Sequence, residues 1–215
     1  MPLRCIVFDC DGVLLDSVGV KTLAFARLAE PYGSEAASRF VAFHEAHGGV
    51  SRYEKFAWFF KTILKRPIRE EESKAWGEKF AALCAEALRQ CPLIPGAREV
   101  LMRWHGVLPL FVCSGAPGKE QEAILQNHGL AQYFDAIYGA PPAKTELLAA
   151  LLAERNIHPS CALMVGDATT DRDAAFATGT HFYGVGSAIA DERYPWGLDL
   201  TNLSAHIESL LKPNV

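Results

Sequence analysis

The chain has 215 residues, of which half are hydrophobic and 21% are charged, and its formal net charge is −4. This composition is ordinary for a globular protein with a sizeable core, and the length fits one domain or one domain with an insert. The acidic balance disfavours nucleic acids and anionic membrane surfaces as partners.

The first apolar run is short and is broken by Asp9 and Asp11, so we expect no secretory signal. No apolar stretch approaches the length that a membrane helix needs, and we expect no membrane partner. The six cysteines include no CxxC pair, and several fall in segments with the pattern of buried strands. We therefore interpret them as reduced thiols of a cytoplasmic protein, not as a disulfide framework or a zinc site.

The unbroken apolar run Cys5–Phe8 predicts a strand that is buried on both faces of a parallel sheet. Asp9 then stands at the carboxyl end of this strand, where ligands bind in open α/β sheets, and Asp11 follows before Gly12. Two carboxylates so close together repel each other unless a cation lies between them. Mg²⁺ is the simplest such cation, because it is a hard ion that prefers oxygen ligands.

The next part of the chain has helical patterns and no convincing strand. Clusters of Pro and Gly separate the apolar periodicities, and they divide the segment into several helices. The expected helices cover residues 18–30, 34–46, 51–66 and 70–90. We predict that residues 17–92 form an all-helical insert that closes at Cys91 and Pro92.

Beyond residue 92 the pattern changes to alternating strands and helices, which predicts βαβ units and a parallel sheet. The expected strands cover residues 108–113, 134–138, 161–165 and 181–185, and the expected helices cover 97–105, 118–128, 144–155, 171–177 and 203–211. Together with the first strand, these elements predict an α/β core with a five-stranded, Rossmann-like parallel sheet.

Polar or charged residues stand at or just beyond the carboxyl ends of four of the five expected strands. They are Asp9 and Asp11, Ser114 and Gly115, Lys144, and Asp167 with Asp171. Because these ends share one edge of a parallel sheet, we expect the side chains to converge there. The set contains a nucleophile, an acid or base, a hydroxyl, a fixed positive charge and further carboxylates, which are the groups that phosphoryl transfer needs.

In these motifs the chain resembles the haloacid dehalogenase (HAD) superfamily, specifically its Mg²⁺-dependent phosphatases with a small helical cap, a group that includes phosphoglycolate phosphatases and β-phosphoglucomutases. The matching segments are DCDGVLLDS at 9–17, Ser114-Gly115, Lys144 and GDATTD at 166–171, in the family's order. The resemblance spans nearly the whole chain. It implies a catalytic core made of residues 1–16 and 93–215 and a cap domain made of residues 17–92.

The resemblance also implies a role for each residue of these motifs. Asp9 would be the nucleophile that forms an aspartyl-phosphate, and Asp11 would protonate the leaving oxygen and then activate water. Mg²⁺ would be held by the Asp9 side chain, the Asp11 backbone carbonyl and Asp167. The implied reaction is hydrolysis of the phosphate ester of a small metabolite.

The remaining motif residues would bind the phosphate and position its partners. Ser114 and the Gly115 amide would contact phosphate oxygens, and Lys144 would neutralise charge near Asp9. Asp171 would orient Lys144 or the waters of the metal.

Within the insert, residues 44–55 combine a flexible turn with His, Arg and Lys side chains. In capped members of the family, a loop in this region reaches over the active site, and we expect Arg52 and Lys55 to contact the substrate. The alternative is an ordinary interhelical connection with solvated charges. His44 and His47 have no third ligand nearby, which disfavours a metal site there.

Three other functions stay open. A sugar phosphomutase is one, although mutases of this type usually have Glu-Asp where this chain has Gly166-Asp167. A dehalogenase is the second, but dehalogenases of the family lack an acid at the position of Asp11. The third is a binding module without catalysis, which the complete motif set disfavours. The substrate and the oligomeric state are left open by the sequence.

Overall fold

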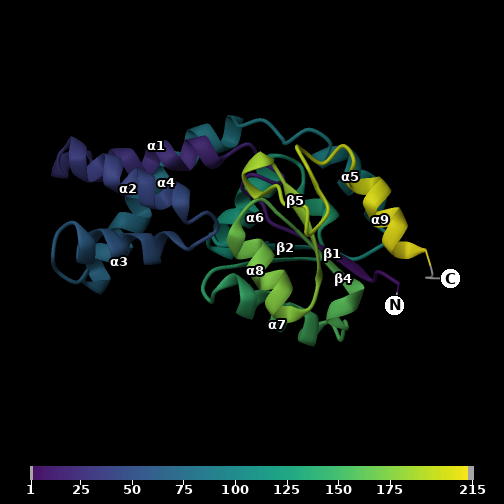
Figure 1. The fold of residues 1–215 in the computed structure, drawn as a ribbon. Helices are drawn as coiled ribbons and strands as arrows, with labels where there is room; N and C mark the ends of the chain where they lie inside the picture. Colours follow the sequence, from purple (N-terminus) through teal and green to yellow (C-terminus); the bar gives the residue numbers. More distant parts are fainter. Residues whose placement is uncertain (1, 213–215) are drawn as a thin grey trace.

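A single parallel sheet of six strands runs through the computed structural model, which describes residues 2–212 (Figure 1). The spatial order is β3-β2-β1-β4-β5-β6, and every neighbouring pair is parallel. The strands are β1 Cys5–Phe8, β2 Leu110–Ser114, β3 Ala136–Gly139, β4 Ala162–Gly166, β5 His181–Val185 and β6 Trp196–Gly197. The predicted α/β class and parallel sheet are therefore confirmed.

The predicted number of five strands was wrong, because β6 adds a sixth at one edge of the sheet. This strand has only two residues, an exposed Trp196 and a half-buried Gly197, and it follows Pro195. Two residues are too few to show the periodicity from which a strand is predicted, and one of them is a glycine. The four longer strands after β1 end within about one residue of their predicted ends.

The strand β1 is fully buried on both faces, as predicted. Ile6 and Phe8 belong to one apolar cluster, whereas Cys5 and Val7 point into another on the opposite face. The first cluster is covered by α5 Ala97–Trp104, α6 Gly118–Asn127 and α9 Leu203–Leu211, and the second by α7 Lys144–Glu154 and α8 Thr169–Thr178. Helices on both faces leave only the ends of the strands free to bind a ligand.

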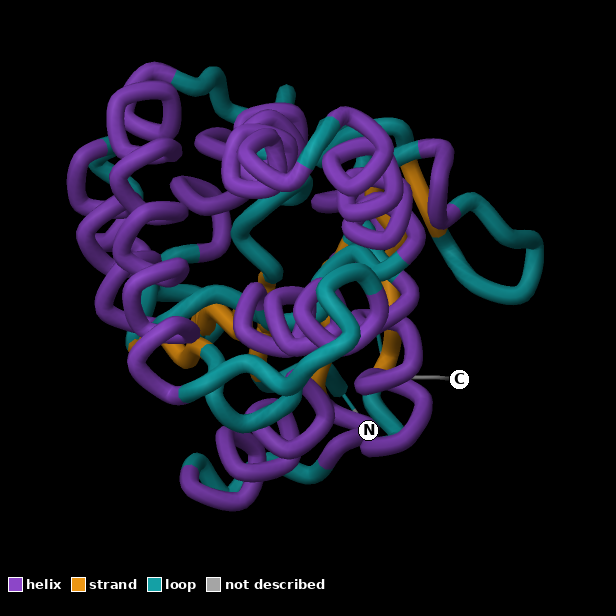
Figure 2. The backbone as a smooth tube through the Cα atoms, turned by 90° about the vertical axis from the view of Figure 1, so that its left-hand side faces the viewer, coloured by secondary structure: helices purple, strands orange, loops and turns teal. Residues whose placement is uncertain are grey.

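Between β1 and α5 the chain is helical, as predicted, and these helices lie to one side of the sheet (Figure 1). They are α1 Val18–Ala29, α2 Ser34–Ala46, α3 Arg52–Thr62 and α4 Glu70–Gln90. Short 3₁₀ helices also occur among the described residues, at Glu30–Tyr32, Ala131–Tyr133, Pro159–Cys161 and Ser187–Ile189. Figure 2 views the molecule from this side, where helices dominate. Phenylalanines at the centre of α1–α4 form an apolar cluster of their own, which includes Phe25, Phe40, Phe56, Phe59 and Phe80.

The two segments that join α1–α4 to the sheet lie side by side. The amide of Asp16 donates a hydrogen bond of 2.9 Å to the carbonyl oxygen of Pro92, and the amide of Ile94 donates one of 3.0 Å to that of Leu14. The chain therefore enters the helical segment and returns from it at adjacent positions, near residues 14–16 and 92–94. Among residues 2–212, none of the helices has both the length and the apolar character of a membrane span.

Candidate active site

Two aspartates extend from adjacent strands at the middle of the sheet. Asp9 follows β1, and its amide donates to the carbonyl oxygen of Val165 in β4 at 2.9 Å. Asp167 follows β4 directly. From β1 the chain goes on to β2 on one side of the sheet, and β4 lies on the other side, so the strand order reverses between the two aspartates. Such a reversal opens a crevice at the carboxyl ends of the strands.

Glycine is required where the first motif turns past the second aspartate. Gly12 has a φ angle of +79°, which other residues rarely adopt, and a Cβ atom there would collide with Oδ2 of Asp167. The backbone after β1 therefore comes as close to Asp167 as it does only because residue 12 lacks a side chain.

Three carboxylates crowd this crevice. Asp9, Asp167 and Asp171 can each place one oxygen atom within 4.8 Å of the others. Burial raises the pKa of Asp9 to about 7, against the opposing effect of Lys144. Burial and the neighbouring Asp9 also raise the pKa of Asp167 well above its ordinary value. A cation among these oxygens would relieve the repulsion, and oxygen ligands of this kind fit Mg²⁺.

Lys144 supplies the fixed positive charge beside these carboxylates. Its Nζ atom lies 2.9 Å from Oδ2 of Asp9 and 2.5 Å from Oδ1 of Asp171. Burial opposes the charge on Lys144, but the two carboxylates outweigh it and raise the pKa of Lys144. The other oxygen of Asp171 accepts from the amide of Ala168 at 3.1 Å. Both oxygens of Asp171 are therefore engaged by donors.

Ser114 and Gly115 lie at the end of β2 and line the same cavity as Asp9. The hydroxyl of Ser114 is buried and accepts from the amide of Ala116 at 3.1 Å, which fixes the turn after the strand. Gly115 touches the insert, because a Cβ atom there would collide with the carbonyl oxygen of Gly49. The loop that follows β2 is therefore in direct contact with the loop between α2 and α3.

Asp11 is held by three donors. Lys21 forms an ion pair with its Oδ2, the Ser17 hydroxyl donates to Oδ1 at 2.6 Å, and the Gln121 amide donates to Oδ2 at 3.0 Å. Burial opposes ionisation of Asp11, but Lys21 and these hydrogen bonds offset it, so that the pKa of Asp11 is lowered. These three donors favour the carboxylate form of Asp11.

Lys21 and Gln121 were not predicted from the sequence. Lys21 lies on α1, one turn beyond Ser17. This closeness to the first motif is the only feature of the sequence that could have indicated a contact with Asp11. Gln121 is fully buried on α6, which no local pattern indicates. Both reach Asp11 only because separate helices pack over it.

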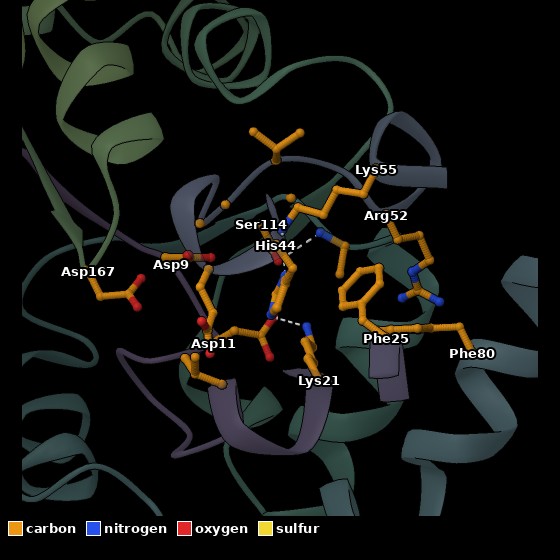
Figure 3. A pocket seen from close by; sticks show the side chains of 17 residues that line it. Asp9, Asp11, Lys21, Phe25, His44, Arg52, Lys55, Phe80, Ser114 and Asp167 are labelled. Carbon is orange, nitrogen blue, oxygen red and sulfur yellow. Dashed lines mark hydrogen bonds and ion pairs between the residues drawn. The ribbon is translucent and has the colours of Figure 1, made fainter. Parts of the chain in front are cut away.

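A cavity of about 110 Å³ lies between the sheet edge and the insert (Figure 3). Arg52 and Lys55, predicted as substrate contacts, both line it. Arg52 lies 2.5 Å from the Glu120 carboxylate and stacks over the Phe80 ring, with 4.8 Å from its Cζ atom to the ring centroid. The sheet side of the cavity is lined by Asp9, Asp11, Ser114, Gly115, Ala116 and Asp167, and the insert side by Val18, Lys21, Phe25, His44, Glu45, Gly48, Gly49, Val50, Arg52, Lys55 and Phe80.

The chain is similar to known hydrolases over most of its length. The family model for haloacid dehalogenase-like hydrolases matches residues 3–179. A phosphoglycolate phosphatase from Vibrio parahaemolyticus is 27% identical over 190 residues, which cover 85% of this chain and 83% of that protein. A phosphorylated carbohydrates phosphatase from Thermotoga maritima is 24% identical and covers 88% of each chain. The crystal structure of a β-phosphoglucomutase from Clostridium difficile superposes with a TM-score of 0.83 at 19% identity, over 97% of both chains.

Proposed function

Because the chain belongs to the family of haloacid dehalogenase-like hydrolases, we propose that it hydrolyses the phosphate ester of a small metabolite with the aid of Mg²⁺. The observation that carries the proposal is the convergence of Asp9 and Asp167 at the sheet side of the cavity, with Lys144 in contact with Asp9. The names of the relatives, which include phosphatases of phosphoglycolate and of phosphorylated carbohydrates, support the same reaction.

The metal part of the proposal assigns Mg²⁺ to the side chains of Asp9 and Asp167 and to the backbone carbonyl of Asp11. The crowding of carboxylates with raised pKa values supports this assignment. Bound there, Mg²⁺ would neutralise negative charge on the phosphate and on the attacking carboxylate. Asp171 would act through Lys144, with which it shares a 2.5 Å contact.

In the first proposed step, a carboxylate oxygen of Asp9 attacks phosphorus and the ester oxygen leaves with a proton from Asp11. Lys144, together with the Ser114 hydroxyl and the Gly115 amide, would bind the phosphate oxygens on which charge accumulates. In the second step, Asp11 takes a proton from water, which attacks phosphorus and releases Asp9. The ion pair with Lys21 favours the carboxylate form of Asp11, which is the form that the second step requires.

The proposal divides the chain into a catalytic core of residues 1–16 and 93–215 and a cap of residues 17–92. The separate aromatic cluster of α1–α4 supports this division, as do the paired connections at Asp16 and Pro92. Opening at these connections would admit the substrate, and closure would exclude water from the intermediate. We place the protein in the cytoplasm, in keeping with its six cysteines, all of which are free thiols.

A phosphomutase would share much of this geometry, but one local feature favours hydrolysis. A Cβ atom at Gly166 would collide with the side chain of Asp171. The glutamate that the resemblance associates with mutases at this position therefore has no room beside Asp171. Product analysis separates the two reactions, because a phosphatase releases inorganic phosphate and a mutase releases an isomeric sugar phosphate.

The test is turnover of p-nitrophenyl phosphate with Mg²⁺ by the wild-type protein and by Asp9→Asn. We expect the variant to fold normally and to lose roughly a thousandfold or more of the activity, because it lacks the nucleophile. Asp173→Asn is the matched control, since Asp173 is an exposed acid on α8. Normal turnover by Asp9→Asn, or none by the wild type, would refute the assignment.

A further inference from the structure

One buried lysine in the cavity has no carboxylate partner. Lys55 is 2% exposed, and among residues 2–212 no Asp or Glu oxygen lies within 4.0 Å of its Nζ atom. The other two cations that line the cavity are paired, Lys21 with Asp11 and Arg52 with Glu120. A buried ammonium without a counter-ion is unfavourable, and a ligand is one way to provide the missing charge.

Lys55 forms a hydrogen bond with one ring nitrogen of His44, and the other ring nitrogen of His44 has no partner. The Nζ atom of Lys55 lies 2.8 Å from Nδ1 of His44. A lysine ammonium can only donate, so Nδ1 accepts and the imidazole proton is on Nε2. His44 is 8% exposed, and its Nε2 atom is buried without a hydrogen-bond partner. Both side chains line the cavity from the insert, with Asp9 and Ser114 on the sheet side (Figure 3).

We propose that Lys55 and His44 bind a carboxylate of the substrate, so that the ester hydrolysed at Asp9 is that of a short phosphorylated carboxylic acid. This inference rests on the phosphatase function proposed above. The carboxylate would lie at the end of the substrate that is remote from phosphorus. Its oxygen atoms would accept hydrogen bonds from the Lys55 ammonium and from the imidazole N–H of His44.

The size of the cavity also favours a short substrate. Its volume is about 110 Å³, whereas sites for drug-sized ligands occupy about 300–1,000 Å³. A cavity of this size favours a carboxylate a few bonds from the phosphate over a sugar bisphosphate or a nucleotide. The remaining acids near Lys55 do not take this place, because Asp11 is engaged by Lys21, while Glu45 and Glu54 are exposed.

The electrostatics around Lys55 also suit an anionic ligand. Burial, with a further contribution from Lys21, lowers the pKa of Lys55 to about 7. Burial and the neighbouring Lys55 lower the pKa of His44 to about 3, so that its imidazole is neutral. A bound carboxylate would restore the charge of Lys55 by offsetting the loss of solvation.

The experiment compares two esters of similar size, 2-phosphoglycolate, which has a carboxylate, and 2-hydroxyethyl phosphate, which has a hydroxyl in its place. For the wild type with Mg²⁺, we expect kcat/KM to favour the carboxylate by about 10- to 100-fold, as charge-assisted hydrogen bonds imply. Lys55→Met should remove most of this preference, because it should raise KM for 2-phosphoglycolate more than KM for 2-hydroxyethyl phosphate. Lys61→Met, an exposed lysine on the same helix, should keep the preference.

The outcomes separate this inference from the phosphatase function. Equal kcat/KM for the two esters in the wild type would overturn the inference and leave the phosphatase function intact. A preference that survives in folded Lys55→Met would also overturn it. If none of the esters, p-nitrophenyl phosphate included, is hydrolysed, the phosphatase function itself fails and the inference falls with it. Should Lys55→Met not fold, the wild-type comparison and His44→Asn, which should lower the preference, decide the matter.

Discussion

Lys144 and Asp9 form a buried ion pair, with 2.9 Å between the Nζ and Oδ2 atoms. The same ammonium contacts Asp171 in the first turn of α8 at 2.5 Å, so that one cation serves two carboxylates from different elements. Neither carboxylate has another cationic side chain within 4.0 Å among the described residues. The position of each group therefore depends on the charge of the others.

We predict that Lys144→Met destabilises the protein by about 3 kcal/mol or more in the absence of metal, because two carboxylates stay buried without their cation. In a double-mutant cycle, Asp9→Asn should reduce this cost by on the order of 1–3 kcal/mol, since the amide needs no counter-ion. Urea unfolding of the four proteins in EDTA measures both quantities. Strictly additive effects would show that Lys144 and Asp9 do not interact.

The carboxylate cluster leads to a second prediction, on metal binding. EDTA should abolish activity and Mg²⁺ should restore it. Independently of activity, Mg²⁺ should raise the melting temperature, because binding to the folded state alone contributes about 2.7 kcal/mol when free Mg²⁺ is about 100 times its dissociation constant.

Two variants serve as the comparison for metal binding. Asp167→Asn should lose most of the rise in melting temperature, whereas Asp173→Asn should keep it because Asp173 is exposed on α8. The proposed metal site would be incorrect if Mg²⁺ raised the melting temperature of Asp167→Asn as much as that of the wild type.

A third prediction concerns stability and pH. The folded-state pKa of Lys55 is about 7, against an ordinary value of 10.5, because burial and Lys21 disfavour its charge. Between these two pH values the unfolded chain binds more protons, so the folded state gains stability as the pH rises. Below about pH 7 the full penalty applies. Lys55→Met avoids the cost of burying a charged ammonium, so it should be more stable than the wild type by on the order of 3 kcal/mol at about pH 6.

The measurement is urea unfolding without ligand at about pH 6 and about pH 9, where the advantage of Lys55→Met should shrink. Lys61→Met should match the wild type at both values, since Lys61 is exposed. An advantage for Lys55→Met that grows with pH would contradict the assignment of a buried, unpaired ammonium.

The sequence was sufficient to predict those parts of the site that lie directly beyond strand ends. Asp9 and Asp167 follow buried apolar runs. In a parallel sheet, residues that follow the strands lie at the same edge. Lys144 was found from the same pattern, because it follows the expected strand at residues 134–138 by a few residues.

What the sequence did not predict depends on packing between elements that are remote in the chain. Lys21 and Gln121 reach Asp11 from α1 and α6, and His44 meets Lys55 only where α2 packs against α3. Each of these residues, taken alone, has the pattern of an ordinary helix position. Their partners become evident only from the arrangement of the helices around the cavity.

The contact between the insert and the sheet edge depends on a glycine. Gly49 has a φ angle of +73°, and a Cβ atom there would collide with Oγ1 of Thr170. That hydroxyl donates to the carbonyl oxygen of Gly48 at 3.1 Å, and the carbonyl of Gly49 itself lies against Gly115. A side chain at position 49 would therefore push the loop away from the residues proposed to bind phosphate.

We predict that Gly49→Ala raises KM for the preferred phosphate ester by roughly tenfold, because an alanine strains this backbone and displaces Thr170. The melting temperature should fall only slightly, since the loop lies outside the apolar clusters. Gly19→Ala is the matched control, because a Cβ atom there meets no heavy atom within 4 Å. Steady-state kinetics on both variants measures the difference, and an unchanged KM in Gly49→Ala would mean that this loop does not help to close the cavity over the substrate.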